Sequence, residues 1–402
     1  MKTLHILYTS HPDITGSSIR SRDILLSQLK IGIKPIIITS PFQNPETKGK
    51  EVEIINNIKY YRTFSGFDDE LVSERKSNIL LQIRKGFRLF KFTYDVYKVA
   101  KKENVDLLHA HSMFFCAISA KISSLLLRRP FIYEVRSLWE ERYKAIGLLT
   151  RLRFTIFTII ETISMFFSNE IIVISENLKR NLLSRSLLSR KRIHVVPNAI
   201  DTSRISISST IRDKSPHVIS FGYIGSLSPI EGLDLLINAF HKLKANGFKN
   251  KLIIIGDGIE KDNLKKLSEG NELIEYRDAV PMDKINSVYD SIDIVINPRR
   301  KSLLSDMITP LKPLEAIMYR KLVMASNIGG MRELLEHNKT AILFKPDSIN
   351  AIFEAIIHTI NRDDIRLIID NAVRHLSRYR SWNINAENYL RIYTALIKSY
   401  RR

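Results

Sequence analysis

The chain contains little cysteine, glycine and tryptophan for its length. Its 402 residues include one cysteine, 15 glycines and two tryptophans. The single Cys116 excludes an intrachain disulfide and fits a reducing compartment. Hydrophobic residues make up 44% and charged residues 26% of the chain, which is ordinary for a globular protein and argues against disorder. Because one hydrophobic core rarely organises so long a chain, we expect two domains of about 200 residues each.

The sequence also lacks an apolar run long enough to cross a membrane. The longest spans residues 154–167, and Arg151, Arg153 and Glu161 keep it below the roughly 20 residues that a spanning helix needs. Its polar positions recur at helical spacing: Arg151, Thr155, Thr158 and Thr162. This pattern predicts an amphipathic helix, which either packs on its domain or lies on a membrane surface. No basic-then-apolar leader precedes the first strand pattern, so we expect no export.

Positive charge is in excess and concentrates in the first half of the chain. The net charge is +20, and residues 1–200 carry 32 Lys and Arg against 18 Asp and Glu. Such a field suits nucleic acid, anionic lipid or a polyanionic substrate. No zinc-finger spacing or aromatic RNA-binding signature accompanies it, so we expect no nucleic-acid partner. An anionic membrane surface and an ordinary solvated surface both remain open.

Short apolar runs alternate with helical patterns almost throughout. This alternation predicts an α/β protein made of two doubly wound, Rossmann-like parallel-sheet domains, at residues 1–200 and 201–380. A terminal helix at 381–402 carries one apolar stripe and must pack on something. The expected strands are 4–9, 35–39, 54–61 (an edge run), 107–109, 131–135, 171–175 and 193–196, then 218–224, 251–255, 273–276, 294–296, 322–325 and 341–344.

Polar residues follow several strands of the first domain. The loop after the first strand holds Gly16 and leads into a helix that carries Arg20; with one glycine instead of three it disfavours NAD binding and suits either a ligand loop or an ordinary capped helix start. His109 and His111 end a buried strand, but no third ligand is spaced nearby, so we expect no metal. Glu134 and Arg136 end the next strand and suit acceptor binding, or pair with each other structurally.

Residues 309–333 are the most informative stretch of the second domain. They place Lys312 and Glu315 at the start of a helix, and Gly329 and Gly330 in the turn that follows a buried strand. Glu315 suits the hydroxyls of a ribose, and Lys312 is a point cation for phosphate. The glycine pair lets the backbone approach a ligand. Together these residues predict a nucleotide-sugar site.

These motifs, in this order over nearly the whole chain, resemble the family 4 retaining glycosyltransferases, which have the GT-B fold. The resemblance is nearest to a branch linked to exopolysaccharide and surface-glycan assembly. It implies that His111 approaches the transferred sugar, that the terminal helix crosses back to the first domain, and that the run Gly256, Asp257 and Gly258 lies near the nucleotide base. It also implies a reaction without metal or cofactor.

The chain departs from the family pattern at its phosphate and acidic positions. Gly225 is present, but Ser226 and Glu231 occupy the places where most members carry Arg and Lys. Arg299, Arg300 and Lys301 are the available replacement cations, beside Lys312. The first acid of the family's Glu pair is displaced or lost, and the nearest acid is Asp306.

The expected function is therefore transfer of a sugar from a nucleotide-diphosphate sugar, expected to be a UDP-sugar, to a lipid-linked or surface-polysaccharide acceptor. We expect a cytoplasmic protein, peripheral on the inner face of an anionic membrane. One alternative is a sugar-nucleotide epimerase, which shares the two-domain fold. The other is a glycan- or lipid-binding protein that has lost catalysis, which the missing Arg, Lys and first Glu favour.

Overall fold

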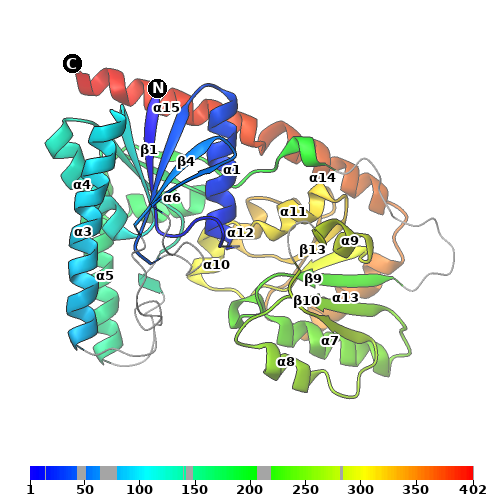
Figure 1. The fold of residues 1–402 in the computed structure, drawn as a ribbon. Helices are drawn as coiled ribbons and strands as arrows, with labels where there is room; N and C mark the ends of the chain where they lie inside the picture. The colour runs from blue at the N-terminus through cyan, green and yellow to red at the C-terminus, as the bar shows by residue number, and fades with distance from the viewer. Residues whose placement is uncertain are drawn as a thin grey trace. The chain divides into compact units, whose positions relative to one another are not determined.

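The computed structural model describes residues 1–13, 15–42, 51–63, 79–138, 140–141, 148–205, 219–280 and 284–401. The chain divides into two compact units, which are unit 1 (Met1–Pro197 with Trp382–Arg402) and unit 2 (Asn198–Ser381). Each unit is built around one sheet flanked by helices (Figure 1). The predicted α/β class with two largely parallel sheets is confirmed.

The sheet of unit 1 has eight strands in the order β3-β4-β2-β1-β5-β6-β7-β8. All neighbours are parallel except β3, which runs antiparallel to β4. The central strands are buried on both faces, which explains their nearly continuous apolar sequence. The strands are β1 (Lys2–Leu7), β2 (Lys34–Thr39), β3 (Val52–Ile55), β4 (Ile58–Arg62), β5 (Leu107–His111), β6 (Phe131–Val135), β7 (Glu170–Val173) and β8 (Ile193–Val195).

The single edge strand predicted at 54–61 is wrong, because this segment is a hairpin of β3 and β4. Asn56 and Asn57 form the turn with φ of 51° and 63°. Asparagine tolerates this left-handed conformation, and two such residues give the tight turn that suits the twist of paired strands. The Asn-Asn pair was therefore the turn signal inside the run.

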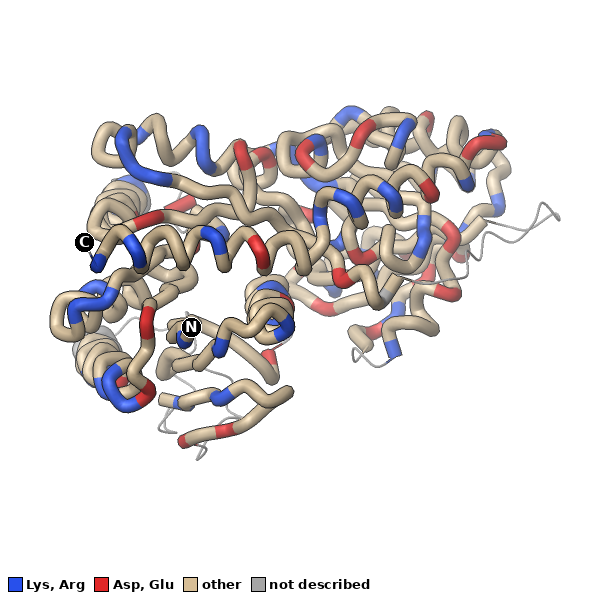
Figure 2. Tube along the Cα trace, turned by 90° about the horizontal axis from the view of Figure 1, so that it is seen from above, with Lys and Arg blue, Asp and Glu red and all other residues tan. Residues whose placement is uncertain are grey.

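Helices cover both faces of the unit 1 sheet (Figure 1). One face carries α3, α4 and α5, with α4 packed against both of the others. On the other face α1 packs against α15. The helices of unit 1 contain more Lys and Arg than Asp and Glu residues. Figure 2 colours Lys and Arg blue and Asp and Glu red along the chain. The helices are α1 (Gly16–Lys30), α3 (Ile79–Glu103), α4 (Phe114–Leu127), α5 (Leu148–Phe166), α6 (Glu176–Leu183) and α15 (Trp382–Arg401).

Unit 2 has a six-stranded, fully parallel sheet in the order β11-β10-β9-β12-β13-β14. Because β9 lies between β10 and β12, the direction of winding reverses there, and open α/β sheets bind ligands outside the carboxyl ends of strands at such a point. The strands are β9 (Ser220–Ile224), β10 (Lys251–Ile255), β11 (Ile274–Arg277), β12 (Ile294–Asn297), β13 (Leu322–Ser326) and β14 (Ile342–Phe344).

Two apolar cores fill the two sides of the unit 2 sheet. Phe221, Phe240 and Leu252 belong to one, and Ile292, Val323 and Leu314 to the other. The helices are α7 (Leu233–Ala245), α8 (Lys261–Leu267), α9 (Ile285–Asp290), α10 (Leu303–Met307), α11 (Lys312–Met318), α12 (Gly329–Arg332), α13 (Ile349–Ile360) and α14 (Ile365–Tyr379).

The helix expected at 154–167 forms as α5, and its predicted polar positions divide between surface and interior: Arg151 and Thr155 are exposed, whereas Thr162 is buried. Glu161 and Thr162 are buried, whereas Ile159 and Ile163 are 51% and 41% exposed. Among the described residues, no helix is both long enough and apolar enough to cross a membrane.

Candidate functional site

The turns after β9 and β10 bring two glycines together at the carboxyl edge of the unit 2 sheet. Gly225 and Gly256 have φ of +142° and +148°. A Cβ on Gly256 would lie 1.8 Å from the carbonyl oxygen of Gly225, and one on Gly225 would lie 2.3 Å from Cε of Lys312. Only glycine fits either place. The absence of these side chains allows Lys312 to lie directly over the turn, beside the exposed Ser226.

Lys312 is the cation at this turn, and protein groups hold it in place. Its Nζ contacts the hydroxyl of Tyr223 and lies 3.0 Å from Oε2 of Glu231, and it sits 4.5 Å from the centre of the Tyr223 ring. Burial lowers the pKa of Lys312, and Glu231 partly offsets that. Glu231 stands where the family resembled usually has a lysine. Here it is the counter-ion of Lys312.

The two arginines after β12 have different surroundings. Arg300 forms ion pairs with Asp234 and, at 3.8 Å, with Asp347. Arg299 has a buried Nε with no hydrogen-bond partner among the described residues, and its charge contributes to the lowered pKa of Lys312. Arg299 is therefore the better placed of the two to bind an anion beside Lys312, because an unpaired buried donor is costly without a ligand.

Two further buried polar atoms at this edge lack partners in the described part of the chain. They are Nδ2 of Asn297, at the end of β12, and Oγ of Ser326, at the end of β13. Sequence reasoning missed both. A polar residue closing an otherwise apolar strand was the available signal.

The turn at Asp257 and Gly258 interlocks with the one that follows Gly225. The amide of Leu227 donates to the carbonyl of Asp257 at 2.8 Å, and a Cβ on Gly258 would lie 2.3 Å from the carbonyl oxygen of Leu227. The Asp257 side chain itself is 71% exposed. The backbone of this run is thus held at the edge where the other glycine turns lie.

Asp306, the predicted catalytic acid, contacts the start of α12. Its Oδ1 accepts a hydrogen bond of 2.5 Å from the amide of Gly329. Gly329 and Gly330 are the first residues of α12, so the predicted turn before that helix is wrong. A Cβ on Gly330 would lie 2.3 Å from the carbonyl oxygen of Ile308, so this position needs glycine. The structure therefore gives Asp306 a backbone partner, and its catalytic role stays a prediction.

Glu315 follows Lys312 by three residues on α11, so both lie on one side of this short helix. It is half-buried. Burial raises the pKa of Tyr289 well above its usual value, and the charge of Glu315 and a hydrogen bond to it add to the effect. Glu315 therefore already has a phenol as a neighbour in the absence of any ligand.

In unit 1, Glu134 lies between two buried arginines. Its Oε1 is 3.1 Å from Nε of Arg20 and 2.8 Å from Nε of Arg136, and Oε2 accepts from the hydroxyl of Tyr389 at 2.6 Å. Burial opposes ionisation, but the two guanidinium charges hold the pKa of Glu134 well below its usual range. These three predicted acceptor residues thus bind one another, and their contact with an acceptor stays a prediction.

Gly16, the fourth predicted acceptor residue, is exposed at the first position of α1. Thr15 caps this helix by accepting from the amide of Ser18, and Ser18 in turn accepts from the amide of Thr15. The ordinary capped helix start that was left open is therefore present.

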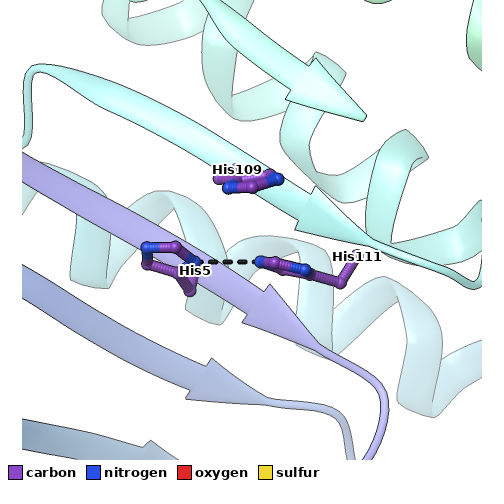
Figure 3. A group of neighbouring side chains, drawn as sticks. All are labelled: His5, His109 and His111. Atoms are coloured by element: carbon purple, nitrogen blue, oxygen red, sulfur yellow. Dashed lines mark hydrogen bonds between the residues drawn. The ribbon is translucent and has the colours of Figure 1, made fainter. Parts of the chain in front are cut away.

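His5, His109 and His111 form one buried cluster (Figure 3). One ring nitrogen of each lies within 4.8 Å of the others. The statement that no third ligand accompanies the two predicted histidines is therefore wrong, because pairing of β1 with β5 places His5 opposite His109. A polar residue inside the apolar run of β1 was the signal.

Hydrogen bonds set the direction of protons through the cluster. Arg136 can only donate, and its Nη2 is 2.5 Å from Nδ1 of His111. Burial lowers the pKa of His5 and His111 well below the usual value, so both rings are neutral at pH 7. His111 then carries its proton on Nε2 and donates to Nδ1 of His5 at 2.9 Å, and His5 donates to Oε1 of Gln28 at 2.9 Å.

The chain of hydrogen bonds continues into α15. Gln28 donates to the hydroxyl of Tyr393 at 3.0 Å, and that hydroxyl donates to Nδ1 of His109 at 2.6 Å. Nε2 of His109 then faces Oε2 of Glu134 at 3.4 Å. Five of the six ring nitrogens thus take part in this internal network, while Nε2 of His109 has no hydrogen-bond partner among the described residues. The expected absence of a metal stays a prediction. The predicted catalytic His111 is 2% exposed and belongs to this network.

Two family descriptions match the chain. "Glycosyltransferase Family 4" matches residues 36–204, and "Glycosyl transferases group 1" matches residues 219–362. Together they cover most of both units.

Several named proteins and solved structures are similar to this chain. The capsular polysaccharide biosynthesis glycosyltransferase CapM of Staphylococcus aureus is 23% identical over 61% of this chain, and the match spans 65% of that relative, just under two thirds of its length. Sucrose-phosphate synthase of Thermosynechococcus elongatus superposes with a TM-score of 0.77 at 14% identity, covering 99% of this chain and 100% of that one.

A third similar protein is Anabaena HepE, solved in complex with UDP and glucose. Its TM-score is 0.68 at 16% identity, covering 98% of this chain and 100% of that one. At these identities the likeness of the solved structures establishes the fold. Taken with the two family matches, it shows that the chain belongs to the family 4 glycosyltransferases and has the GT-B fold.

Proposed function

We propose that this chain transfers a sugar, with retention of anomeric configuration, from a nucleotide-diphosphate sugar to a glycan acceptor carried on a lipid. The donor is a UDP-sugar, bound at the carboxyl edge of the unit 2 sheet. The reaction needs no metal or cofactor. The protein acts in the cytoplasm, on the inner face of the membrane.

One observation carries the donor site, which is the pair of cations at the glycine turn. Lys312 lies over Gly225, and Arg299 has an unpaired buried Nε beside it. Two cations at a turn whose backbone a ligand can approach suit a diphosphate. When the sugar leaves, the diphosphate gains charge, and cations fixed in advance stabilise that charge most in the transition state.

Glu315 extends the site toward the nucleoside. It lies on the same helix as Lys312, three residues further on. An ionised carboxylate accepts hydrogen bonds from both hydroxyls of a ribose. The spacing thus suits one ligand that carries a phosphate and a ribose.

The names of similar proteins support the choice of donor and acceptor. HepE was solved with UDP and glucose, and CapM is named for capsular polysaccharide biosynthesis. Yeast relatives that are 25% identical over 56% of this chain are named as phosphatidylinositol N-acetylglucosaminyltransferase subunits, and they act on a lipid by that name. A lipid-linked acceptor is consistent with both groups.

A nucleotide-release screen tests the proposal. Purified protein is incubated with UDP-, GDP- and ADP-sugars, with and without membrane extract as acceptor, in buffer containing a metal chelator. We expect UDP release that requires the extract and survives chelation. Isomerised nucleotide sugar without extract would indicate an epimerase, and binding without release would indicate a non-catalytic protein.

Replacing Lys312 tests the phosphate contact. Lys312→Ala should weaken UDP by about tenfold or more and leave uridine nearly unchanged, because only UDP carries the charge that Lys312 binds. Calorimetric titration of both ligands measures this, with Lys339→Ala, whose side chain is 75% exposed, as the matched control. Equal losses for UDP and uridine would instead mean that Lys312 only supports the fold.

A further inference from the structure

Large exposed hydrophobic side chains gather on the helices that cover one face of the unit 1 sheet. The helices α3, α4 and α5 hold 58 of the 402 residues. Among the residues that the structure describes, 13 of the 23 large exposed hydrophobic side chains lie on them or directly after α5. We call this set the three-helix apolar face: Phe87, Phe90, Tyr94, Ile118, Ile122, Leu125, Leu126, Leu152, Ile156, Ile159, Ile163, Phe166 and Phe167.

On each helix these residues recur at helical spacing on the side that faces away from the sheet. In α4, Ile118, Ile122 and Leu125 are exposed, while Ser119 and Ser123 between them are buried. In the second half of α5, Ile159 and Ile163 are likewise exposed while Glu161 and Thr162 are buried. In its first half, Arg151, Arg153 and Thr155 are exposed on the surface with the apolar residues. A surface helix of a soluble protein normally has the opposite orientation.

Hydrogen bonds fix this orientation. Thr93 of α3 and Ser119 of α4 bond at 2.9 Å, which joins the two helices through their inner sides. Glu161 of α5 accepts from the hydroxyl of Tyr133 in the sheet at 2.8 Å. Because buried polar groups are costly without partners, rotating these helices to hide the apolar side would break these bonds.

Cations accompany aromatic residues at the end of α5. Lys121 lies 5.6 Å from the ring centre of Phe167, and Lys191 lies 5.2 Å from that of Phe166. Burial and the charge of Lys121 lower the pKa of Lys191, so the two ammonium groups are close enough to repel. Nζ of Lys191 donates to the carbonyl of Ser168 at 2.8 Å, a neutral partner that leaves its charge unbalanced. The only acid of α4 and α5 is the buried Glu161.

We propose that the three-helix apolar face docks on an anionic membrane, with its apolar side chains in the lipid interface and Lys121 and Lys191 at the phosphate headgroups. An apolar face with basic residues and few acids is what an interfacial surface requires. Lysine stems lie along apolar surface while their charges reach the headgroups. The inference rests on the proposed function only in that a lipid-linked acceptor gives the docking a purpose.

The observations favour lipid over a protein partner. Exposed apolar side chains gathered on one face in this way mark an interaction site. The absence of exposed acids on α4 and α5 matches a negatively charged surface, which a protein partner would present only in patches. A second copy of the chain would set Lys121 and Lys191 against like charges near a symmetry axis or leave them unpaired.

Vesicle co-sedimentation tests the docking. The probes are phosphatidylcholine vesicles with and without phosphatidylglycerol. We expect binding to the anionic vesicles that weakens as salt rises. Phe87→Ser with Phe90→Ser should reduce it roughly tenfold or more for each phenylalanine, and Lys121→Ala with Lys191→Ala about fivefold for each lysine. Leu367→Ser, on the 56% exposed Leu367 of unit 2, should bind as the unchanged protein does.

Three results would overturn the proposal. One is the absence of binding to anionic vesicles at low salt, and another is equal loss of binding in the Leu367→Ser control. The third is a dimer in light scattering that the Phe87 and Phe90 changes convert to a monomer, which would make this face a contact between copies. Calorimetric titration of the same variants with UDP separates the docking proposal from the proposed function. Loss of vesicle binding with intact UDP binding concerns docking alone, and loss of UDP binding with intact vesicle binding concerns the donor site alone.

Discussion

At the scale of single residues, the donor edge of unit 2 shows how a lost cation changes the role of its neighbours. Glu231 stands where most family members carry lysine, and it pairs with Lys312 at 3.0 Å. Burial and the charge of Arg299 lower the pKa of Lys312, and Glu231 offsets part of that shift. A diphosphate bound there would meet both the cation and the carboxylate.

Removing that carboxylate should tighten phosphate binding. Glu231→Gln keeps the shape and removes a negative charge beside the proposed diphosphate, so UDP affinity should rise about threefold to tenfold, on the order of 1 kcal/mol. Calorimetry of UDP and uridine measures this, with the exposed Glu272→Gln as control. Weaker UDP binding by Glu231→Gln would show that the carboxylate is needed to position Lys312.

Glu315 should contribute to affinity through the ribose. Glu315→Ala should weaken the binding of both UDP and uridine by about 1–3 kcal/mol, because the ribose hydroxyls of either ligand would lose their hydrogen-bond acceptor. Tyr289→Phe is the matched control, because it removes the phenol beside Glu315 but keeps the carboxylate. If Glu315→Ala binds UDP as tightly as the unchanged protein, the ribose contact does not exist.

At the scale of elements, α5 packs a buried carboxyl, that of Glu161, against the sheet. Burial raises the pKa of Glu161 to about 8, with the hydrogen bond from Tyr133 acting in the opposite direction. The carboxyl is therefore protonated in the folded protein near neutral pH. Its Oε1 has no partner among the described residues, which fits a group that has kept its proton.

This carboxyl makes stability depend on pH. The folded-state pKa of about 8 lies above the ordinary value of 4.5, so the folded state holds the proton longer than the unfolded state does. Stability is fully present below about pH 4.5 and falls as pH rises toward 8, by up to about 1.4 kcal/mol per pH unit. Glu161→Gln should remove this contribution.

Urea unfolding of both forms between pH 5 and pH 8.5 measures the difference. The free energy of unfolding of Glu161→Gln should exceed that of the unchanged protein increasingly as pH rises. Tyr133→Phe with intact Glu161 should keep the slope, since the group that titrates is the carboxyl. Parallel curves for the unchanged protein and Glu161→Gln would exclude a protonated Glu161.

At the scale of the whole molecule, hydrogen bonds join the two ends of the chain inside unit 1. Tyr393 of α15 bonds to His109 of β5, 284 residues away in sequence. The same hydroxyl accepts from Gln28 of α1. Burial of Trp382, Tyr389 and Tyr393 adds an apolar contribution to this attachment.

Loss of one hydroxyl should loosen that attachment. Tyr393→Phe leaves a donor on Gln28 and an acceptor on His109 without a partner in a buried place, which costs about 1–3 kcal/mol. Urea unfolding of the full chain measures this, and Tyr400→Phe, whose ring is 39% exposed on the same helix, is the control. Equal stability of both variants would mean that water replaces the lost hydroxyl.

The sequence by itself determined the fold class and most strands, because buried parallel strands are short apolar runs bounded by turn residues. It also located the glycine turns, since Gly225 and Gly256 adopt backbone conformations that other residues avoid. The family followed from the order of these motifs. The hairpin at 52–62 was missed because two adjacent asparagines replaced the more usual turn glycine.

Only the tertiary structure decided how side chains from distant segments meet. It placed His5 beside His109 and His111, paired Glu231 with Lys312, and buried Glu161 and Thr162 of α5 against the domain. Local periodicity could identify α5 as amphipathic, but not which side faces the protein. That choice depends on buried partners such as Tyr133, whose positions are set by the sheet and not by the sequence of the helix.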